Sequence, residues 1–226
     1  MKVTYLGHAS LGIEANGKHI IVDPFISANE LAKHINIDTL KADYILLTHA
    51  HQDHVLDVEA IAWRTGAKII CNAEMSYYYG NKGLNVVGMN TGGKAEFDGI
   101  LIKSTIAFHS SSFSDGTYGG NPNGYVLEAN EKRIYIAGDT SLTYEMKLIP
   151  ETIGKLDLAV FPVGDHFTMG FEDACLASDF VQCDKVLGYH FDTFPPIKID
   201  HENAKSFFSS KGKELILLEI GKSMEV

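Results

Sequence analysis

The sequence of 226 residues is poor in cysteine, proline and tryptophan, with three, six and one of each. Cys71, Cys175 and Cys183 form no pair with ligand spacing, and an odd number cannot all be disulfide-bonded within one chain. Small apolar filler in a reduced, cytoplasmic setting is therefore their expected role. No apolar run is long enough to span a bilayer, and Met1–Tyr5 leads straight into strand-like sequence without a secretory signal. We therefore expect a cytoplasmic protein with no membrane segment.

Positive charge is scarce as well. Lys and Arg number 19 against 29 Asp and Glu, which gives a formal net charge of −10. A non-specific nucleic-acid surface needs clustered Lys and Arg, so no nucleic-acid partner is expected. An anionic substrate is not excluded, because bound cations reverse the local sign of charge. The hydrophobic share of 45% is ordinary for a globular protein, and we expect a single domain over residues 1–226.

Histidine, by contrast, is concentrated in one stretch, Thr48-His49-Ala50-His51-Gln52-Asp53-His54. The apolar run before this stretch predicts a buried strand. Residues i and i+2 of an extended backbone point the same way, so His49 and His51 can bind one ion together. Asp53 and His54 follow where a helix should begin, and they can face a second ion or another side of the first. Such nitrogen and oxygen donors suit zinc, and also iron or manganese.

A polar turn with Asp53 as a helix cap is the competing explanation, but three histidines and one aspartate at these spacings disfavour it. The pattern His49-x-His51-x-Asp53-His54 resembles the signature of the metallo-β-lactamase superfamily. The resemblance covers essentially the whole chain. It implies an α+β fold, the four-layer αββα sandwich of two mixed β-sheets flanked by helices. It also implies seven metal ligands, namely His49, His51, Asp53, His54, His109, Asp139 and His190.

The resemblance implies two divalent metal ions, most simply zinc, with manganese or iron as alternatives. His49, His51 and His109 would hold the first ion, and a second would lie between the other ligands, with Asp139 bridging the two. A water shared by such cations ionises near neutral pH and attacks a carbonyl or phosphoryl centre. Asp53 and Asp139 are the expected catalytic carboxylates, because Asp53 could steer the water or protonate the leaving group. A compatible role for Asp139 and Thr140 is to cap a helix over Leu142–Leu148.

Four further residues are candidates beside the metals. Asp23 matches an aspartate that supports the ligand loop in the superfamily, although turn initiation before Pro24 would also explain it. His8, in Gly7-His8-Ala9-Ser10, resembles the start of a branch that includes ascorbate-6-phosphate lactonase; it has either a pocket role or a structural role in a turn. The same branch has a loop like residues 162–170, which makes His166 and Thr168 substrate-side candidates, with a turn built for its glycines as the alternative.

These features predict a metal-dependent hydrolase that acts on a small-molecule ester, lactone, amide or phosphodiester. Flavodiiron oxygen reductases carry glutamate where His51 stands, which favours a hydrolytic site here. An iron-dependent oxidoreductase or dioxygenase on the same fold, and a metal-binding module without activity, remain the alternatives. The segment Ser27–Lys41 is expected to cover part of the pocket or to contact another subunit of a homo-oligomer.

The remaining pattern predicts strands followed by helices, twice. Asn16-Gly17 predicts a tight hairpin between strands at Leu11–Ala15 and Ile20–Val22. Apolar residues at helical spacing predict one helix that ends at Gly66. A final helix from His201 to Ser210 and a closing strand over Leu215–Ile220 complete the chain.

Overall fold

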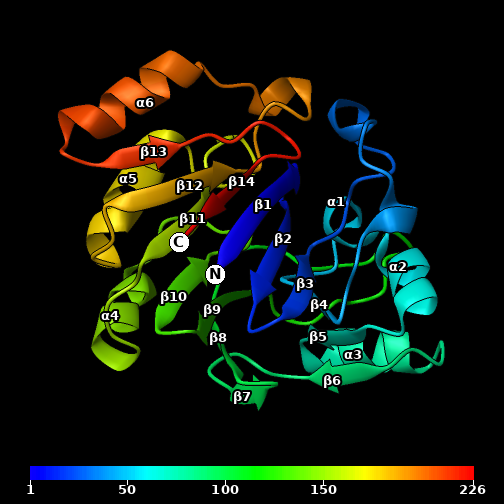
Figure 1. Ribbon diagram of the computed structural model, residues 1–226. Helices are drawn as coiled ribbons and strands as arrows, with labels where there is room; N and C mark the ends of the chain where they lie inside the picture. Colours follow the sequence, from blue (N-terminus) through cyan, green and yellow to red (C-terminus); the bar gives the residue numbers. More distant parts are fainter.

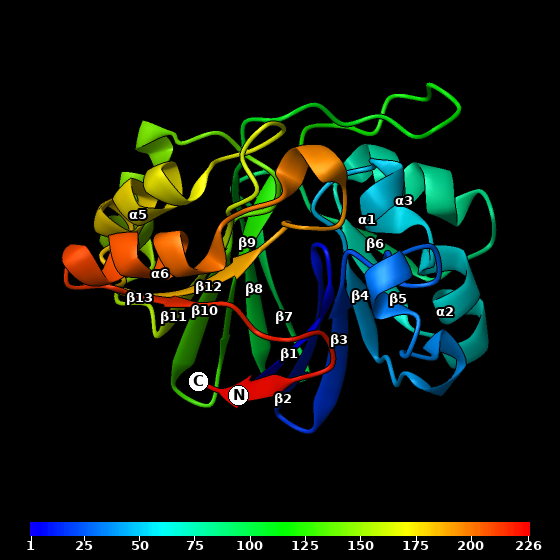
Figure 2. The same ribbon diagram turned by 90° about the horizontal axis from the view of Figure 1, so that it is seen from above.

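The computed structural model describes residues 1–226 as two seven-stranded β-sheets packed face to face, with helices on the outer side of each sheet (Figure 1, Figure 2). This is the αββα sandwich predicted from the sequence. Both sheets mix parallel and antiparallel neighbours, as the prediction also required. No helix has the length and hydropathy that a bilayer crossing needs.

The first sheet has the strand order β14-β1-β2-β3-β4-β5-β6. Its strands are β1 (Lys2–Gly7), β2 (Ser10–Ala15), β3 (Lys18–Val22), β4 (Tyr44–Leu46), β5 (Lys68–Cys71), β6 (Val86–Gly88) and β14 (Ser223–Glu225). The associated helices are η1 (Glu30–Ala32), η2 (Ile37–Thr39), α1 (Gln52–Val55), α2 (Val58–Thr65) and α3 (Ala73–Gly80). Asn16 and Gly17 both have positive φ, 52° and 76°, as the predicted hairpin turn requires.

The second sheet has the order β13-β12-β11-β10-β9-β8-β7. Its strands are β7 (Lys94–Phe97), β8 (Ile100–Ile106), β9 (Asn123–Ala129), β10 (Lys132–Ile136), β11 (Leu158–Pro162), β12 (Lys185–Tyr189) and β13 (Glu214–Ile216). The helices of this half are η3 (Tyr144–Lys147), α4 (Leu148–Thr152), α5 (Phe171–Phe180), η4 (Pro195–Ile197) and α6 (His201–Ser210).

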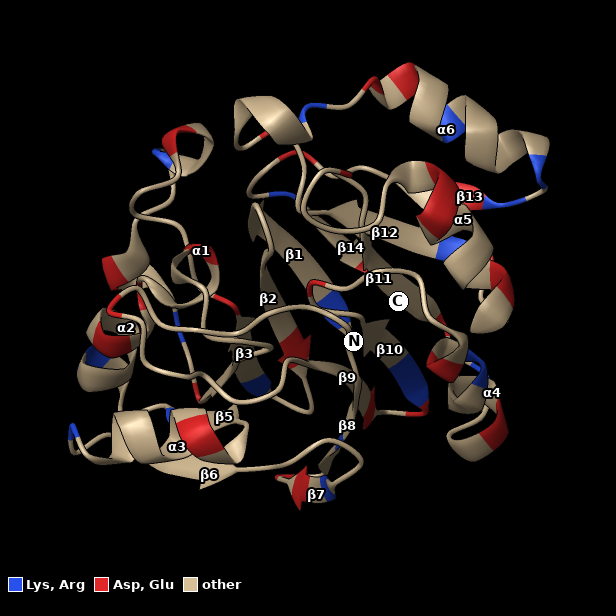
Figure 3. Ribbon diagram, turned by 180° about the vertical axis from the view of Figure 1, so that it is seen from behind, with Lys and Arg blue, Asp and Glu red and all other residues tan.

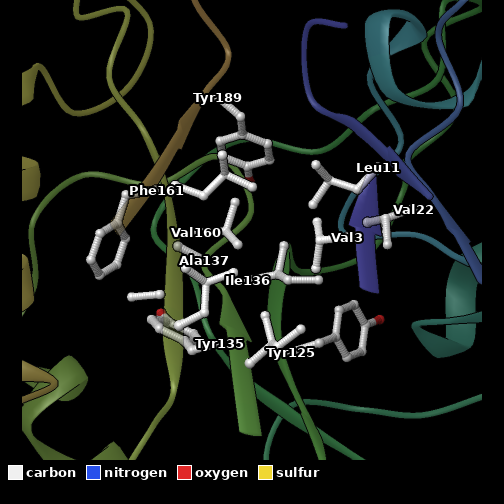
Figure 4. Packing of buried hydrophobic residues seen from close by; sticks show 14 of the residues in the cluster. Val3, Leu11, Val22, Tyr125, Tyr135, Ile136, Ala137, Val160, Phe161 and Tyr189 are labelled. Carbon is white, nitrogen blue, oxygen red and sulfur yellow. The ribbon is translucent and has the colours of Figure 1, made fainter. Parts of the chain in front are cut away.

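Apolar side chains from both sheets form the central core. Figure 4 shows Val3, Leu11 and Val22 of the first sheet near Tyr125 and Ile136 of the second, and all five side chains are buried. Fully burying one such aliphatic side chain contributes roughly 1.5–3 kcal/mol. This packing fixes the two sheets against each other, and with them the loops that follow their strands.

The structure corrects the predicted helix over Leu142–Leu148. Thr140 does not cap a helix: its hydroxyl accepts from the Phe108 backbone N–H and donates to the Ser141 carbonyl. The first helical turn after it is η3, capped by Thr143, and α4 begins at Leu148. Asp139 and Thr140 therefore stay in an irregular segment at the end of β10.

The predicted closing strand over Leu215–Ile220 is also too long. β13 ends at Ile216, and the chain crosses to the first sheet, where Gly221 donates to the Tyr5 carbonyl and β14 pairs with β1. The predicted helix before Gly66 is broken into α1 and α2. Between them, the Asp57 carboxylate accepts the backbone N–H groups of Ile26 and Ser27.

Candidate metal centre

The candidate side chains all follow strands at one edge of the sandwich. His8 follows β1, Asp23 follows β3 and the Thr48–His54 stretch follows β4. In the second sheet, His109 follows β8, Asp139 follows β10 and His190 follows β12. The carboxyl ends of neighbouring parallel strands open on the same edge, so distant parts of the chain meet there.

Asp139 lies at the centre of the group. Its Oδ2 atom is 3.0 Å from His190 Nε2 and 3.3 Å from His54 Nε2. The same oxygen is 3.7 Å from His109 Nε2 and 4.0 Å from His49 Nε2. Gly138 makes this position possible: its φ is 69°, and an added Cβ would lie 2.7 Å from the Asn123 carbonyl oxygen. One carboxylate oxygen therefore faces four imidazoles.

His49, His51 and His109 form a cluster whose nitrogens lie within 4.8 Å of one another. The His49 Nε2 and His51 Nδ1 atoms are 3.0 Å apart. Thr48 donates its hydroxyl proton to Asp23, so its oxygen accepts from His49 Nδ1–H, 3.0 Å away. This fixes the tautomer of His49 and leaves a lone pair on Nε2 directed at the cluster, as a metal ligand requires.

The second cluster contains His8, Asp53, His54 and His190, with donor atoms within the same 4.8 Å. Asp23 accepts a hydrogen bond from His54 Nδ1 at 2.9 Å, which turns Nε2 toward Asp139. Burial opposes the charged form of His54, but Asp139 and Asp23 raise its pKa well above the usual range, so a cation bound at Nε2 would displace a proton. That Nε2 atom is buried and has no hydrogen-bond partner. A buried nitrogen without a partner is costly in a folded protein, so the arrangement fits a cation at this point.

The distances between donors also fit metal binding. A tetrahedral ion with bonds of about 2.0–2.1 Å separates its ligands by ~3.4 Å. Asp53 Oδ2 is 3.9 Å from both His54 Nε2 and His190 Nε2, and Asp139 Oδ2 is 3.0–3.3 Å from the same two nitrogens. These residues therefore have the donor types and the separations of a four-ligand cation site.

His8 holds the Asp53 carboxylate in place. Its Nε2 donates to Asp53 Oδ2 at 3.0 Å, and its Nδ1 accepts from the Thr193 hydroxyl, also at 3.0 Å. Its backbone carbonyl accepts from the Tyr5 hydroxyl and from the His190 N–H. Burial lowers the pKa of His8 to about 4, so its ring is neutral at pH 7. The sequence left the role of His8 open between pocket and turn. The structure places His8 in a turn, outside the lining of the hollow described below, with its ring hydrogen-bonded to Asp53.

The buried charges keep the carboxylates ionised. Burial would raise the pKa of Asp139, but His190 and His54 hold it well below the usual range. Burial likewise opposes ionisation of Asp53, and the hydrogen bond from His8 lowers its pKa despite this. Burial and the neighbouring His54 lower the pKa of His49, which favours its neutral form. Ionised carboxylates and neutral imidazoles are the forms that bind cations.

Three residues of the site adopt left-handed backbone conformations, His8 (φ 54°), Asp23 (φ 42°) and His190 (φ 56°). Each costs roughly 1–2 kcal/mol for a residue other than glycine. All three side chains are buried, and His190 donates its N–H to the His8 carbonyl. Packing and hydrogen bonding therefore hold these side chains in positions that an isolated chain would avoid.

A hollow of about 460 Å³ opens above the cluster, lined by His51, Asp53, His109, Ser110, Asp139, Phe167, His190, Phe194 and Pro196. The predicted substrate-side residues His166 and Thr168 are not among them, and His166 is exposed. Phe167, between these two, lines the hollow instead. Residues 27–41 do not line it either. Sequence reasoning missed Phe167, Phe194 and Ser110, because single aromatic and hydroxyl residues in loops carry no ligand spacing.

Comparison with known proteins identifies the family. Residues 2–190 match the model of the beta-lactamase superfamily domain. The chain belongs to this superfamily. A UPF0173 metal-dependent hydrolase of Flavobacterium johnsoniae is 62% identical over 226 residues, covering 100% of both chains. This superfamily member is accordingly a metal-dependent hydrolase of the UPF0173 group. The predicted metal-dependent hydrolase is thereby confirmed.

Two solved structures share this fold. Igni18, a metallo hydrolase from the archaeon Ignicoccus hospitalis, is 36% identical with a TM-score of 0.89, covering 100% of this chain and 98% of that one. CmlA, a diiron β-hydroxylase from Streptomyces venezuelae, is 15% identical with a TM-score of 0.78, covering 100% of this chain and 54% of that one. The second likeness concerns the fold alone.

Proposed function

We propose that this hydrolase holds two divalent metal ions and uses them to hydrolyse a small-molecule substrate. The first ion would take His49 Nε2, His51 Nδ1 and His109 Nε2 as ligands. The second would take Asp53, His54 and His190. Asp139 would be shared between them.

One observation carries this proposal: Asp139 Oδ2 lies within 4.0 Å of four imidazole nitrogens that come from both halves of the chain. A carboxylate placed between two groups of imidazoles is suited to bridge two cations about 3.5–4 Å apart. A single ion would not require donors on both sides of the carboxylate.

Two divalent ions bound there would make a shared water acidic and would polarise the substrate oxygen. The protein's own groups determine the geometry of that chemistry. Asp23 orients His54 directly and His49 through Thr48. His8 orients Asp53, whose side chain is 30% exposed and lines the hollow, so Asp53 can accept a proton from water or return one to a leaving group.

Zinc is the metal we propose, because imidazoles and carboxylates at tetrahedral separations suit it. Manganese and iron share these ligand preferences in part. A small-molecule ester, lactone, amide or phosphodiester is the proposed substrate range.

The test is elemental analysis of the purified chain, combined with a hydrolysis screen of esters, lactones, thioesters and phosphodiesters with and without chelator. We expect two equivalents of zinc or manganese per chain and hydrolysis that stops when the metal is removed. Stoichiometric iron with oxygen consumption would point to an oxidoreductase instead. Two bound metals without turnover of any substrate class would point to a binding module.

A further inference from the structure

The hollow above the metal centre has no cationic side chain. Its lining contains neither Lys nor Arg. Lys198, two residues beyond Pro196 in the sequence, is exposed and lies outside the lining. The Lys and Arg segments in Figure 3 lie instead on elements such as β10 and α6. A phosphate or carboxylate group distant from the metals would therefore find no charge-assisted hydrogen bond here.

The wall of the hollow beyond the candidate ligands is mainly apolar. Phe167, Phe194 and Pro196 form this part of the lining, and Ser110 is its one polar member. Phe167 is 52% exposed although it lines the hollow. Exposed aromatic side chains in the lining of a hollow are typical of a binding surface for apolar groups.

Phe194 is fixed in place by the residues that build the metal centre. Its ring makes an edge contact with His8, with ring centroids 5.3 Å apart, and lies 6.2 Å from the ring of Phe25. His8 in turn donates to Asp53. The apolar wall therefore has a defined position relative to the candidate metal ligands, as a specificity pocket requires.

We propose that the part of the substrate beyond the reacting group is uncharged and apolar, and that it lies against Phe167 and Phe194. The substrate class is then an aryl or alkyl ester or lactone rather than a phosphorylated or carboxylated metabolite. The inference rests on the proposed function, because it assumes that the reacting group sits at the metals. It narrows the substrate range, which the metal ligands alone leave open.

The test uses hydroxamic acids, which share one metal-binding group and differ only in the attached arm. Acetohydroxamate has almost no arm, phenylacetohydroxamate has an apolar arm and succinic monohydroxamate has an anionic arm. Their dissociation constants are measured by calorimetry on the zinc-loaded chain. We expect phenylacetohydroxamate to bind at least about tenfold more tightly than acetohydroxamate. A tenfold gain in affinity requires only that part of the phenyl ring is buried. The anionic arm of succinic monohydroxamate should give no gain in affinity over acetohydroxamate.

Matched variants show where the arm binds. Phe167→Ala should remove most of the gain from the phenyl arm and leave the affinity for acetohydroxamate and the zinc content unchanged. Phe194→Leu should reduce the gain by less, since leucine preserves some apolar contact. Tyr77→Ala is the control, because Tyr77 is 73% exposed on α3 and does not line the hollow.

Tighter binding of the succinic arm than of the phenyl arm would overturn the inference, and so would a phenyl gain that persists in Phe167→Ala combined with Phe194→Leu. Failure of the proposed function has a different signature. If none of the three probes bound the zinc-treated chain, and no zinc were retained, the metal centre and the inference would both be wrong. Selective binding without hydrolysis would contradict only the proposed catalysis.

Discussion

The two halves of the chain share a strand plan but use it differently. In the first half, β1, β2 and β3 are antiparallel neighbours, and β4, β5 and β6 follow in parallel. In the second half, β8, β9 and β10 are antiparallel neighbours, and β11, β12 and β13 follow in parallel. Equivalent strand ends therefore occur twice, once on each side of the site.

Equivalent positions carry the same residue types with different contacts. Strands are counted here from β1 in the first half and from β8 in the second, which leaves out the edge strand β7. A histidine then follows the first strand of each half, His8 after β1 and His109 after β8. An aspartate follows the third strand of each half, Asp23 after β3 and Asp139 after β10. His8 and Asp23 hydrogen-bond to candidate ligands, whereas His109 and Asp139 face each other within the cluster. The strand topology thus determines at which strand ends a polar side chain lies, and the neighbouring residues determine which contacts it makes.

The two halves differ most in the segments that follow their fourth strands. β4 leads into the Thr48–His54 stretch, while β11 leads into a loop closed by a bridge between Gly164 and Gly170. That loop exposes His166 and supplies Phe167 to the hollow. One half therefore concentrates candidate metal donors in one stretch, and the other contributes Asp139, His109 and His190 from separate strand ends and part of the apolar wall.

Replacing the aspartate of the second half should have the largest effect. Asp139→Asn removes the anionic charge between four imidazoles, and we expect metal affinity to fall by more than ~100-fold at one site at least. Hydrolysis should be lost together with the metal. Mass-spectrometric metal analysis of the purified variant checks this, and full retention of two metal equivalents would contradict the bridging role.

The equivalent aspartate of the first half should have a smaller effect on the metal. Asp23→Asn weakens the acceptor for Thr48 and His54, and zinc affinity should fall roughly 10–100-fold. The free energy of unfolding should also fall by about 1–3 kcal/mol, because the buried donors of Thr48 and His54 lose a charged partner. Competition with a chromophoric chelator and denaturant unfolding measure the two effects. A loss of affinity as large as that of Asp139→Asn would show that Asp23 is itself a ligand.

His8 offers a finer test of the first-strand position. His8→Ala removes the donor to Asp53, and we expect about tenfold weaker metal binding at the second site and a changed absorption spectrum of the cobalt-substituted chain. His8→Gln keeps an amide donor at a similar reach and should restore much of the wild-type spectrum. Identical spectra for wild type and His8→Ala would contradict the role of His8 in positioning Asp53.

The smallest effect is expected for the fourth-strand loop. His166→Ala should change metal content and hydrolysis by less than about twofold, because substitutions at exposed sites outside the candidate ligands and the lining of the hollow usually have little effect. Steady-state kinetics on whichever screened substrate is hydrolysed provide the comparison. A substantial rise in KM would restore His166 as a substrate contact.

The sequence was informative wherever chemistry and spacing coincided. His49, His51, Asp53 and His54 are close in sequence, and the apolar strand before them is strongly patterned. His109, Asp139 and His190 could be connected with them only through the family resemblance, because spacing within a chain does not say which strand ends meet. The contacts of His8 with Asp53 and Thr193 span 45 and 185 residues, so only the folded structure reveals them.

Local patterns failed where tertiary contacts took over. Leu217–Ile220 continues an apolar run, yet this segment leaves the second sheet because the following residues bond to Tyr5 and pair with β1. β7 was not predicted, because its residues alternate between exposed and half-buried at a sheet edge and give little apolar signal. Phe167 and Phe194 became recognisable as a wall only when the loops that carry them were placed beside Asp139.

The most direct test of the central claim is an anomalous-diffraction map of crystals of the zinc-loaded protein. Two zinc peaks are predicted, both within about 2.0–2.2 Å of Asp139 carboxylate oxygens. One should lie against His49, His51 and His109, and the other against Asp53, His54 and His190. A single peak, or zinc bound away from Asp139, would contradict a shared two-metal centre.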